Sequence, residues 1–200
     1  MLITRRSLLS VATVIPLAPT FAHAAEPASQ GERAIGSPTA KVTVQEFFSL
    51  TCTHCAHFAN TTFPKVKAEL IDTGKIRYVF RDFPLDQVAL TAAMVARTLP
   101  AERYEPFVNA LLANQDRWAF NRQANPTEEM WKIAALAGMS RATFDAAIAN
   151  TELKNWILTQ QQADQTKYKI SATPSFAING KTTSGAMSFE DFAKFVSEAT

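Results

Sequence analysis

The chain has 200 residues, of which 47% are hydrophobic, enough for one core or for one domain with an inserted subdomain. Lysine and arginine number 20 against 18 acidic residues. Removal of a leader that contains Arg5 and Arg6 would leave 18 against 18. A nearly neutral chain gives no support for nucleic acid or an anionic membrane surface as a partner, so we expect neither.

The first 24 residues have the pattern of an export signal. Arg5-Arg6 precedes an apolar run over 8–17, and Ala22-His23-Ala24 is a small-x-small cleavage pattern. The run is too short, and too interrupted by prolines, to span a bilayer. We therefore predict a signal peptide at 1–24 that is cleaved near Ala24, with general secretory and twin-arginine export both open.

After this leader the pattern changes from irregular to β and then to helical. Residues 25–40 are small and rich in turn formers, which predicts a flexible N-terminal lead-in. Residues 41–48 alternate as in a strand, and helical spacing follows as far as Gly74. A second strand is predicted at 76–80, which completes a βαβ unit with parallel strands. Pro64 must kink or split the helix because its ring removes an N–H and clashes one turn back.

From residue 84 to residue 168 the pattern is helical, with apolar side chains three and four positions apart. Asn125-Pro126 and Ser140 are expected helix starts within this stretch, and Gly138 an expected helix end. We therefore predict an all-helical insertion at 84–168.

The end of the chain returns to β structure. A short strand is predicted at 173–178, and Asn179-Gly180 is a strong two-residue hairpin signal. Ser188 with Asp191 resembles a capping box before a final helix. The order of elements is therefore βαβ, a helical insertion, then ββα.

The two cysteines of the chain, Cys52 and Cys55, stand where the first strand gives way to a helix. Free N–H groups and the positive end of the dipole at a helix start favour a thiolate over a thiol, and a protonated His54 would add positive charge. We therefore expect Cys52 to be an exposed nucleophile of low pKa. Cys55, one turn deeper, would resolve a mixed disulfide. The sequence predicts a redox dithiol.

The same cysteine pair would fit three other uses less well. A static disulfide across four residues would contribute little loop-closure entropy. Haem attachment requires a histidine directly after the second cysteine, where Ala56 stands. Zinc would require two further ligands, and His57 is the one candidate nearby. We therefore expect no metal and no cofactor.

Glu46 lies six positions before Cys52 and shares a strand face with Val42, Val44 and Phe48. A carboxyl group buried under the dithiol would have a raised pKa and could accept or pass on a proton as Cys55 ionises. The alternative is a glutamate at the strand end that is turned to solvent.

The order of elements, with Cys-Thr-His-Cys at 52–55 and Thr173-Pro174 before a later strand, resembles the DsbA family of exported thiol–disulfide oxidoreductases. The match covers about residues 41–200. It implies an α/β thioredoxin-like fold formed by 41–83 and 169–200, with an inserted all-helical subdomain at 84–168.

The resemblance also implies roles for individual residues. Cys52 would be the attacking thiol and Cys55 the resolving thiol, Thr53 and His54 would tune the redox potential, and Glu46 would be the family's buried acid. The family's strongest oxidants are most associated with Pro-His between the cysteines. Thr53 lacks the rigidity of that proline, and this difference can shift the redox potential.

Thr173-Pro174 matches the family's cis-proline loop, which lies against the active-site sulfurs. A cis bond would leave the backbone of Thr173 free to pair with an extended substrate peptide. An ordinary trans proline at a strand edge is the alternative.

Three functions follow from this resemblance. The first is a periplasmic oxidase that introduces disulfide bonds into reduced exported client proteins and is re-oxidised by a DsbB-type, quinone-linked membrane partner. The second is a disulfide isomerase or reductase, and the third a non-catalytic, chaperone-like binding domain. About 16 residues between the cleavage site and residue 41 are too few for the dimerisation module of isomerases of this class, which favours a monomeric oxidase.

Overall fold

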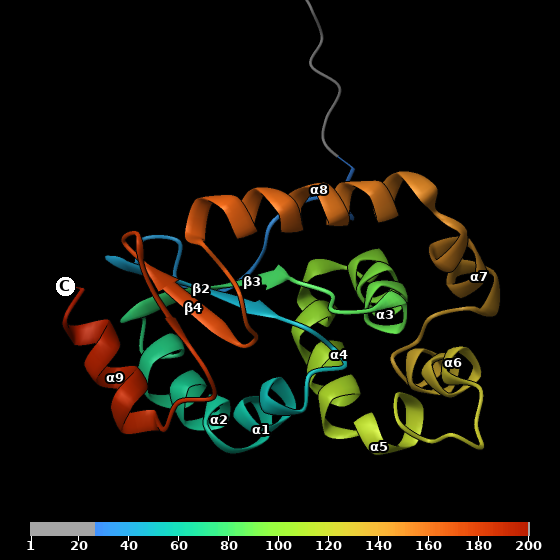
Figure 1. Ribbon diagram of the computed structural model, residues 1–200, viewed down its shortest axis with the longest axis horizontal. Helices are drawn as coiled ribbons and strands as arrows, with labels where there is room; N and C mark the ends of the chain where they lie inside the picture. The colour runs from blue at the N-terminus through green and yellow to red at the C-terminus, as the bar shows by residue number, and fades with distance from the viewer. Residues whose placement is uncertain (1–26, 200) are drawn as a thin grey trace, which may run out of the picture.

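The computed structural model describes residues 27–199, so the predicted signal peptide and its cleavage near Ala24 lie outside the described residues. A five-stranded mixed sheet has the order β1-β3-β2-β4-β5. Helices cover both faces of the sheet, and a group of helices stands beside it (Figure 1). The strands are β1 (Arg33–Gly36), β2 (Val42–Phe48), β3 (Ile76–Asp82), β4 (Ser175–Ile178) and β5 (Lys181–Ser184).

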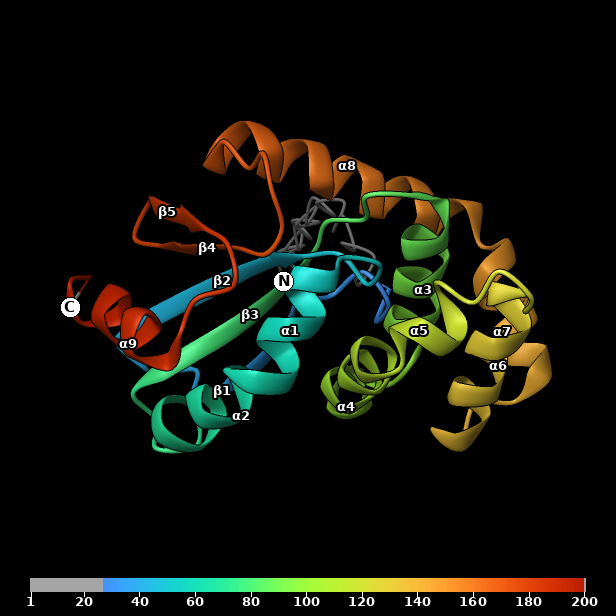
Figure 2. The same ribbon diagram turned by 60° about the horizontal axis from the view of Figure 1, so that its bottom comes forward.

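The helices follow the predicted order along the chain. They are α1 (Thr53–Thr61), α2 (Phe63–Val66), the π-helical turn η1 (Lys67–Ile71), α3 (Gln87–Thr98), α4 (Ala101–Ala113), α5 (Gln115–Trp118), α6 (Pro126–Leu136), α7 (Arg141–Ala149), α8 (Thr151–Tyr168) and α9 (Phe189–Ser197). In a turned view α1, α2 and α9 lie on one side of the sheet, and α8 crosses the other side (Figure 2). None of these helices is both long enough and apolar enough to cross a membrane.

The predicted βαβ unit is confirmed. Strands β2 and β3 pair in parallel, from Val42 opposite Ile76 to Phe48 opposite Asp82. The connecting helix is broken as expected, because α1 ends at Thr61 and Pro64 lies in the first turn of α2.

The predicted helical stretch and the return to β structure are confirmed as well. Six helices, α3 to α8, occupy residues 87–168, and the side chains of Asn125 and Ser140 cap α6 and α7. Strand β4 then pairs antiparallel with β2 and β5. Asn179 and Gly180 turn the hairpin with φ values of 48° and 81°, in the left-handed region that this type of turn requires.

The lead-in prediction needs a correction, because residues 33–36 form the edge strand β1 and pair antiparallel with β3. The Arg33 side chain, buried in spite of its charge, donates a hydrogen bond of 2.7 Å to the carbonyl oxygen of Arg97. Arg97 in turn donates to the carbonyl oxygen of Gly31 at 3.1 Å. Four residues with one strong apolar side chain give no alternation that a sequence reading could detect.

Aromatic side chains fill the layer between the sheet and helices α1, α2 and α9. Ring centroids within this cluster lie 4.8–6.4 Å apart, and its members are Phe58, Phe63, Tyr78, Phe80, Phe176 and Phe192. This aromatic cluster therefore lies against α1, the helix that begins at the two cysteines.

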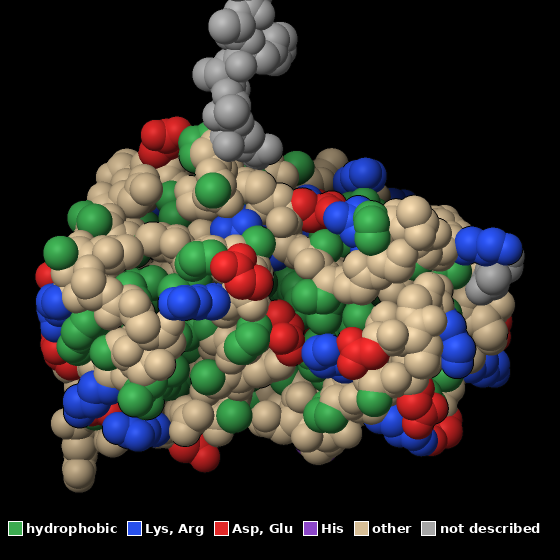
Figure 3. Space-filling model, turned by 180° about the vertical axis from the view of Figure 1, so that it is seen from behind, with side chains coloured by type: hydrophobic (Ala, Val, Ile, Leu, Met, Phe, Trp, Pro, Cys, Tyr) green, Lys and Arg blue, Asp and Glu red, His purple; other side chains and the backbone are tan. Residues whose placement is uncertain are grey.

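Charged side chains of both signs are scattered over the surface seen from behind (Figure 3).

Two glycine substitutions should test how tightly β1 packs. Gly36 and Gly74 both have positive φ, 88° and 73°, but an added Cβ would lie 2.7 Å from the Ile76 carbonyl oxygen at Gly36 and would meet nothing within 4 Å at Gly74. We expect Gly74→Ala to lower the free energy of unfolding by about 1 kcal/mol, the cost of left-handed backbone, and Gly36→Ala by roughly 2–3 kcal/mol. Urea unfolding measures both, and equal losses would contradict close packing of β1.

Candidate active site

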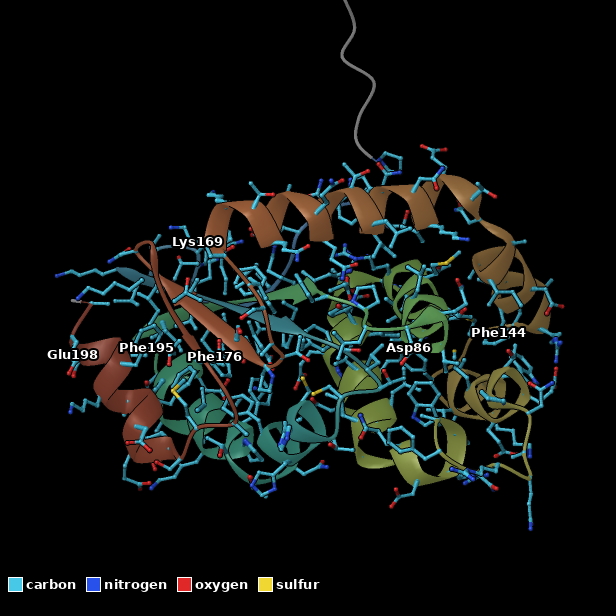
Figure 4. All side chains as sticks on the ribbon, in the orientation of Figure 1. Asp86, Phe144, Lys169, Phe176, Phe195 and Glu198 are labelled. Carbon is cyan, nitrogen blue, oxygen red and sulfur yellow. The ribbon has the colours of Figure 1, made fainter. Side chains whose placement is uncertain are left out.

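Cys52 is the N-cap residue of α1, at the carboxyl end of the central strand β2. Its backbone is extended, with φ −81° and ψ 118°, and its carbonyl oxygen accepts the Ala56 N–H at 3.1 Å. Its sulfur accepts the Cys55 N–H at 3.4 Å. Figure 4 labels Phe176 on β4 and Asp86 before α3, the two elements between which α1 lies in that view. The predicted transition from strand to helix at Cys52 is therefore confirmed.

The surroundings of Cys52 lower its pKa to about 5. The hydrogen bond from the Cys55 thiol contributes most, burial opposes it, and Thr173 and the backbone N–H groups of Cys55 and His54 add to the lowering. The Cys52 sulfur lies 3.2 Å from the Thr173 carbonyl oxygen, so the neutral thiol can donate there. The Thr173 hydroxyl is buried without a partner among the described residues, so it is available to donate to the ionised sulfur.

One expectation about the cysteine motif needs correction. Cys52 was expected to be exposed, but only 8% of the residue is accessible, because the loop at Thr173 packs against its sulfur. His54 is exposed and contributes its backbone N–H to the lowering of the Cys52 pKa, and the role of its ring stays a prediction. Thr53 is exposed as well.

Cys55 has the opposite chemistry. It is completely buried, and burial, the hydrogen bond to Cys52 and the nearby Glu46 charge all raise the pKa of its thiol far above the usual value. Both cysteines are free thiols in this structure. The site therefore holds an ionised sulfur, in a residue that is 8% exposed, beside a protonated and fully buried thiol.

Glu46 is buried, as its strand phase predicted, with 5% of the residue exposed, which excludes the solvent-facing alternative. The Tyr78 hydroxyl donates a hydrogen bond of 2.8 Å to its Oε2 atom. Burial raises the pKa of Glu46 to about 7, the Tyr78 hydrogen bond lowers it, and the charge of Cys52 raises it further. A carboxyl group with this pKa can give or take a proton near neutral pH.

Thr173 and Pro174 were predicted to lie against the sulfurs. The 3.2 Å contact between Cys52 and Thr173 joins them across 121 residues of sequence, and the Thr173–Pro174 bond is cis. Within residues 27–199 no cluster of three or more His, Cys, Asp or Glu side chains could hold a metal ion.

Three further residues hold the site together and were not predicted from the sequence. Tyr78 contacts Glu46 from the neighbouring strand, and Asp86 accepts a 2.6 Å hydrogen bond from the Thr51 hydroxyl. Gln115 donates to two carbonyl groups of the segment that leads into Cys52. These contacts link residues 32 to 65 positions apart, so local patterns gave no signal for them, although Asp86 fits the usual choice of helix N-cap residue.

Comparisons with known proteins point the same way as the geometry. A family model described as thioredoxin matches residues 28–198. A Rickettsia typhi protein named "Putative protein-disulfide oxidoreductase" is 33% identical over 147 residues, 73% of this chain and 54% of that protein. Its Rickettsia prowazekii counterpart is 31% identical over 166 residues, 82% and 60% of the two chains. This chain thus spans little more than half the length of these relatives.

A solved structure is similar over nearly its whole length. The crystal structure of Wolbachia pipientis alpha-DsbA1 superposes with a TM-score of 0.77 at 29% sequence identity. The superposition covers 86% of this chain and 96% of that one. The predicted thioredoxin-like fold with a helical insertion is confirmed.

The thiolate absorbance of the reduced protein should titrate with a midpoint of about 5. Cys52→Ser should abolish this titration. Cys55→Ala should keep it but move the midpoint upward, because the largest stabilising hydrogen bond is lost. A wild-type midpoint near the free-cysteine value of about 8.5 would contradict stabilisation of the thiolate by the Cys55 thiol and the other donors around it.

Glu46→Gln should change how stability depends on pH. Because the folded-state pKa is raised from 4.5 to about 7, the folded state holds the proton more tightly and loses stability as pH rises through this interval. Glutamine cannot ionise, so we expect the variant to exceed wild type by about 3 kcal/mol at pH 8 and to match it near pH 4. Urea unfolding at both pH values measures this, with the exposed Glu69→Gln as control. If Glu46→Gln and wild type lost the same free energy of unfolding between pH 4 and pH 8, the raised pKa of Glu46 would be contradicted.

Proposed function

This chain belongs to the DsbA family of thioredoxin-fold proteins, and on this premise we propose that it is an exported oxidase that introduces disulfide bonds into other proteins. The observation that carries the proposal is the pair of sulfurs with opposite protonation, Cys52 ionised at the edge of the site and Cys55 protonated beneath it.

In the proposed reaction the enzyme begins with a Cys52–Cys55 disulfide. A client thiolate attacks the Cys52 sulfur, the Cys52–Cys55 bond breaks, and Cys55 leaves with the electron pair. Glu46, whose pKa of about 7 leaves it partly protonated, gives the proton that Cys55 needs.

A second client thiolate then attacks the client sulfur of the mixed disulfide. Cys52 leaves as a thiolate, the client has lost two electrons and gained a disulfide, and the enzyme has gained both electrons. Leaving is fast because a low-pKa thiol is a good leaving group. The backbone of Thr173, next to the Cys52 sulfur, would pair with the extended client chain.

The direction of the reaction follows from the charge on Cys52. Hydrogen bonds that stabilise the thiolate stabilise the reduced enzyme, and they do less for a neutral disulfide. The disulfide form is therefore the less stable partner, so it passes its oxidation on to clients. This supports an oxidase over an isomerase or reductase of the same fold.

The rest of the proposal rests on the sequence. Residues 1–24 would direct export to the periplasm by the general or the twin-arginine route, and the thioredoxin-like domain, which includes strand β1, would carry the helical insertion at 84–168. The enzyme would act as a monomer, without metal or cofactor, and a DsbB-type membrane oxidase would restore its disulfide. Thr53 and His54 would tune the potential from the exposed first turn of α1.

Equilibration with glutathione buffers tests the direction of the reaction. We expect a potential closer to about −120 mV, as in a strongly oxidising family member, than to about −270 mV, as in thioredoxin. A value near that of thioredoxin would instead favour the reductase.

Trapping separates an enzyme from a binding domain. With a reduced model client and an oxidant, Cys55→Ala should accumulate a mixed disulfide through Cys52, and Cys52→Ser should form none and lose oxidase activity. Full function in the Cys52→Ser variant would favour the chaperone-like alternative.

A further inference from the structure

The segment from Ser49 to Cys52, which joins β2 to α1, is held by the helical insertion. Gln115, the first residue of α5, is buried with 6% of the residue exposed. Its Nε2 atom donates to the Leu50 carbonyl oxygen at 2.8 Å and to the Cys52 carbonyl oxygen at 3.0 Å. One side-chain amide thus uses both of its hydrogens on the backbone that leads to the nucleophile.

The carbonyl group that Gln115 contacts is part of the helix start itself. The Cys52 carbonyl oxygen also accepts the Ala56 N–H at 3.1 Å, the bond that opens α1. The next N–H groups, of His54 and Cys55, are those that act on the Cys52 sulfur. Movement of this carbonyl would therefore move the sulfur relative to its donors.

Two other contacts join the insertion side to the same segment, but they act farther from the sulfur. Asp86 accepts from the Thr51 hydroxyl at 2.6 Å, and the Leu85 N–H donates to the Ser49 hydroxyl oxygen at 3.3 Å. Both fix side chains that precede Cys52. Gln115 differs because it binds the Cys52 peptide group and directs the positive ends of two N–H dipoles toward the segment.

We propose that Gln115 is a positioning residue for the nucleophile, which acts through the carbonyl groups of Leu50 and Cys52 to keep the first turn of α1 aligned on the Cys52 sulfur. The proposal rests on the function proposed above. It makes the helical insertion a working part of the dithiol site.

Gln115→Met tests the proposal, because methionine has nearly the same length and no donor. The matched control is Gln161→Met. Gln161 is half-buried in α8, and its Nε2 atom donates a 3.0 Å hydrogen bond to the carbonyl oxygen of Pro84. The Pro84–Leu85 peptide group touches the dithiol segment at the Ser49 hydroxyl, so this control perturbs a contact three residues before Cys52 and not the carbonyl groups that Gln115 binds. Both variants should lower thermal stability.

The readout is the thiolate titration of Cys52, which a merely structural role would not change. We expect Gln115→Met to move the midpoint upward by about 0.5 pH unit or more and to slow alkylation of Cys52 at pH 6, while Gln161→Met leaves both unchanged. Gln115→Glu, which keeps size and polarity but directs a carboxylate at two carbonyl oxygens, should move it at least as far and provides a second variant if the methionine variant does not fold.

A wild-type midpoint near 5 with an unchanged Gln115→Met midpoint would overturn the positioning role and leave the proposed function intact. Equal shifts in Gln115→Met and Gln161→Met would also overturn it. An ordinary thiol midpoint in the wild type would instead count against the proposed function.

Discussion

The structure depends on one ionised sulfur held at the start of a helix. Burial of Cys52 opposes its charge, yet its pKa falls to about 5 because donors converge on the sulfur from Cys55, Thr173 and the backbone of the first turn. The charge is stable only while these donors keep their geometry, since hydrogen bonds weaken steeply when they are misaligned. Packing around the site therefore has a chemical consequence, because each element that fixes a donor also fixes the reactivity of Cys52.

Two cysteines three residues apart differ so strongly because the first caps the helix and the second is buried one turn farther along it. Cys52 caps the helix and receives its N–H groups, whereas Cys55 lies completely buried in the core, where burial raises the pKa of its thiol most and the Glu46 charge disfavours a second anion. Glu46 in turn is harder to ionise when Cys52 is charged. The ionisation of these three groups is therefore coupled, since a charge on one raises the pKa of another. The Tyr78 hydroxyl donates to the Glu46 carboxyl at 2.8 Å. Loss of charge at one group eases ionisation of the others, which suits a reaction in which thiolates form in turn.

The sequence predicted those parts of the site that depend on local patterns. Alternation placed Glu46 on the buried face, and the helix pattern after the first strand placed Cys52 at the helix start. Asn179-Gly180 predicted the hairpin from its turn chemistry alone. Strand β1, the cover over Cys52, and the contacts of Tyr78 and Gln115 depend on segments brought together only by the sheet order and the insertion. Local sequence patterns do not predict such contacts, and nothing in the sequence distinguishes Gln115 from a glutamine on the surface.

The topology explains why the insertion reaches the sulfur from two sides. Strand β2, which ends just before Cys52, has β3 and β4 as its neighbours in the sheet. The insertion leaves the sheet after β3 and returns to it before β4, so its first turn brings Asp86 to Thr51 and the segment that follows its last helix brings Thr173 to Cys52. Gln115, also within the insertion, adds a third contact, because its side chain donates to the Leu50 and Cys52 carbonyl oxygens. Both ends of the insertion lie at the carboxyl end of β2, because β3 runs parallel to β2 and ends there, and β4 runs antiparallel to β2 and begins there. The point of insertion is therefore the feature that lets helices far away in the sequence control the nucleophile.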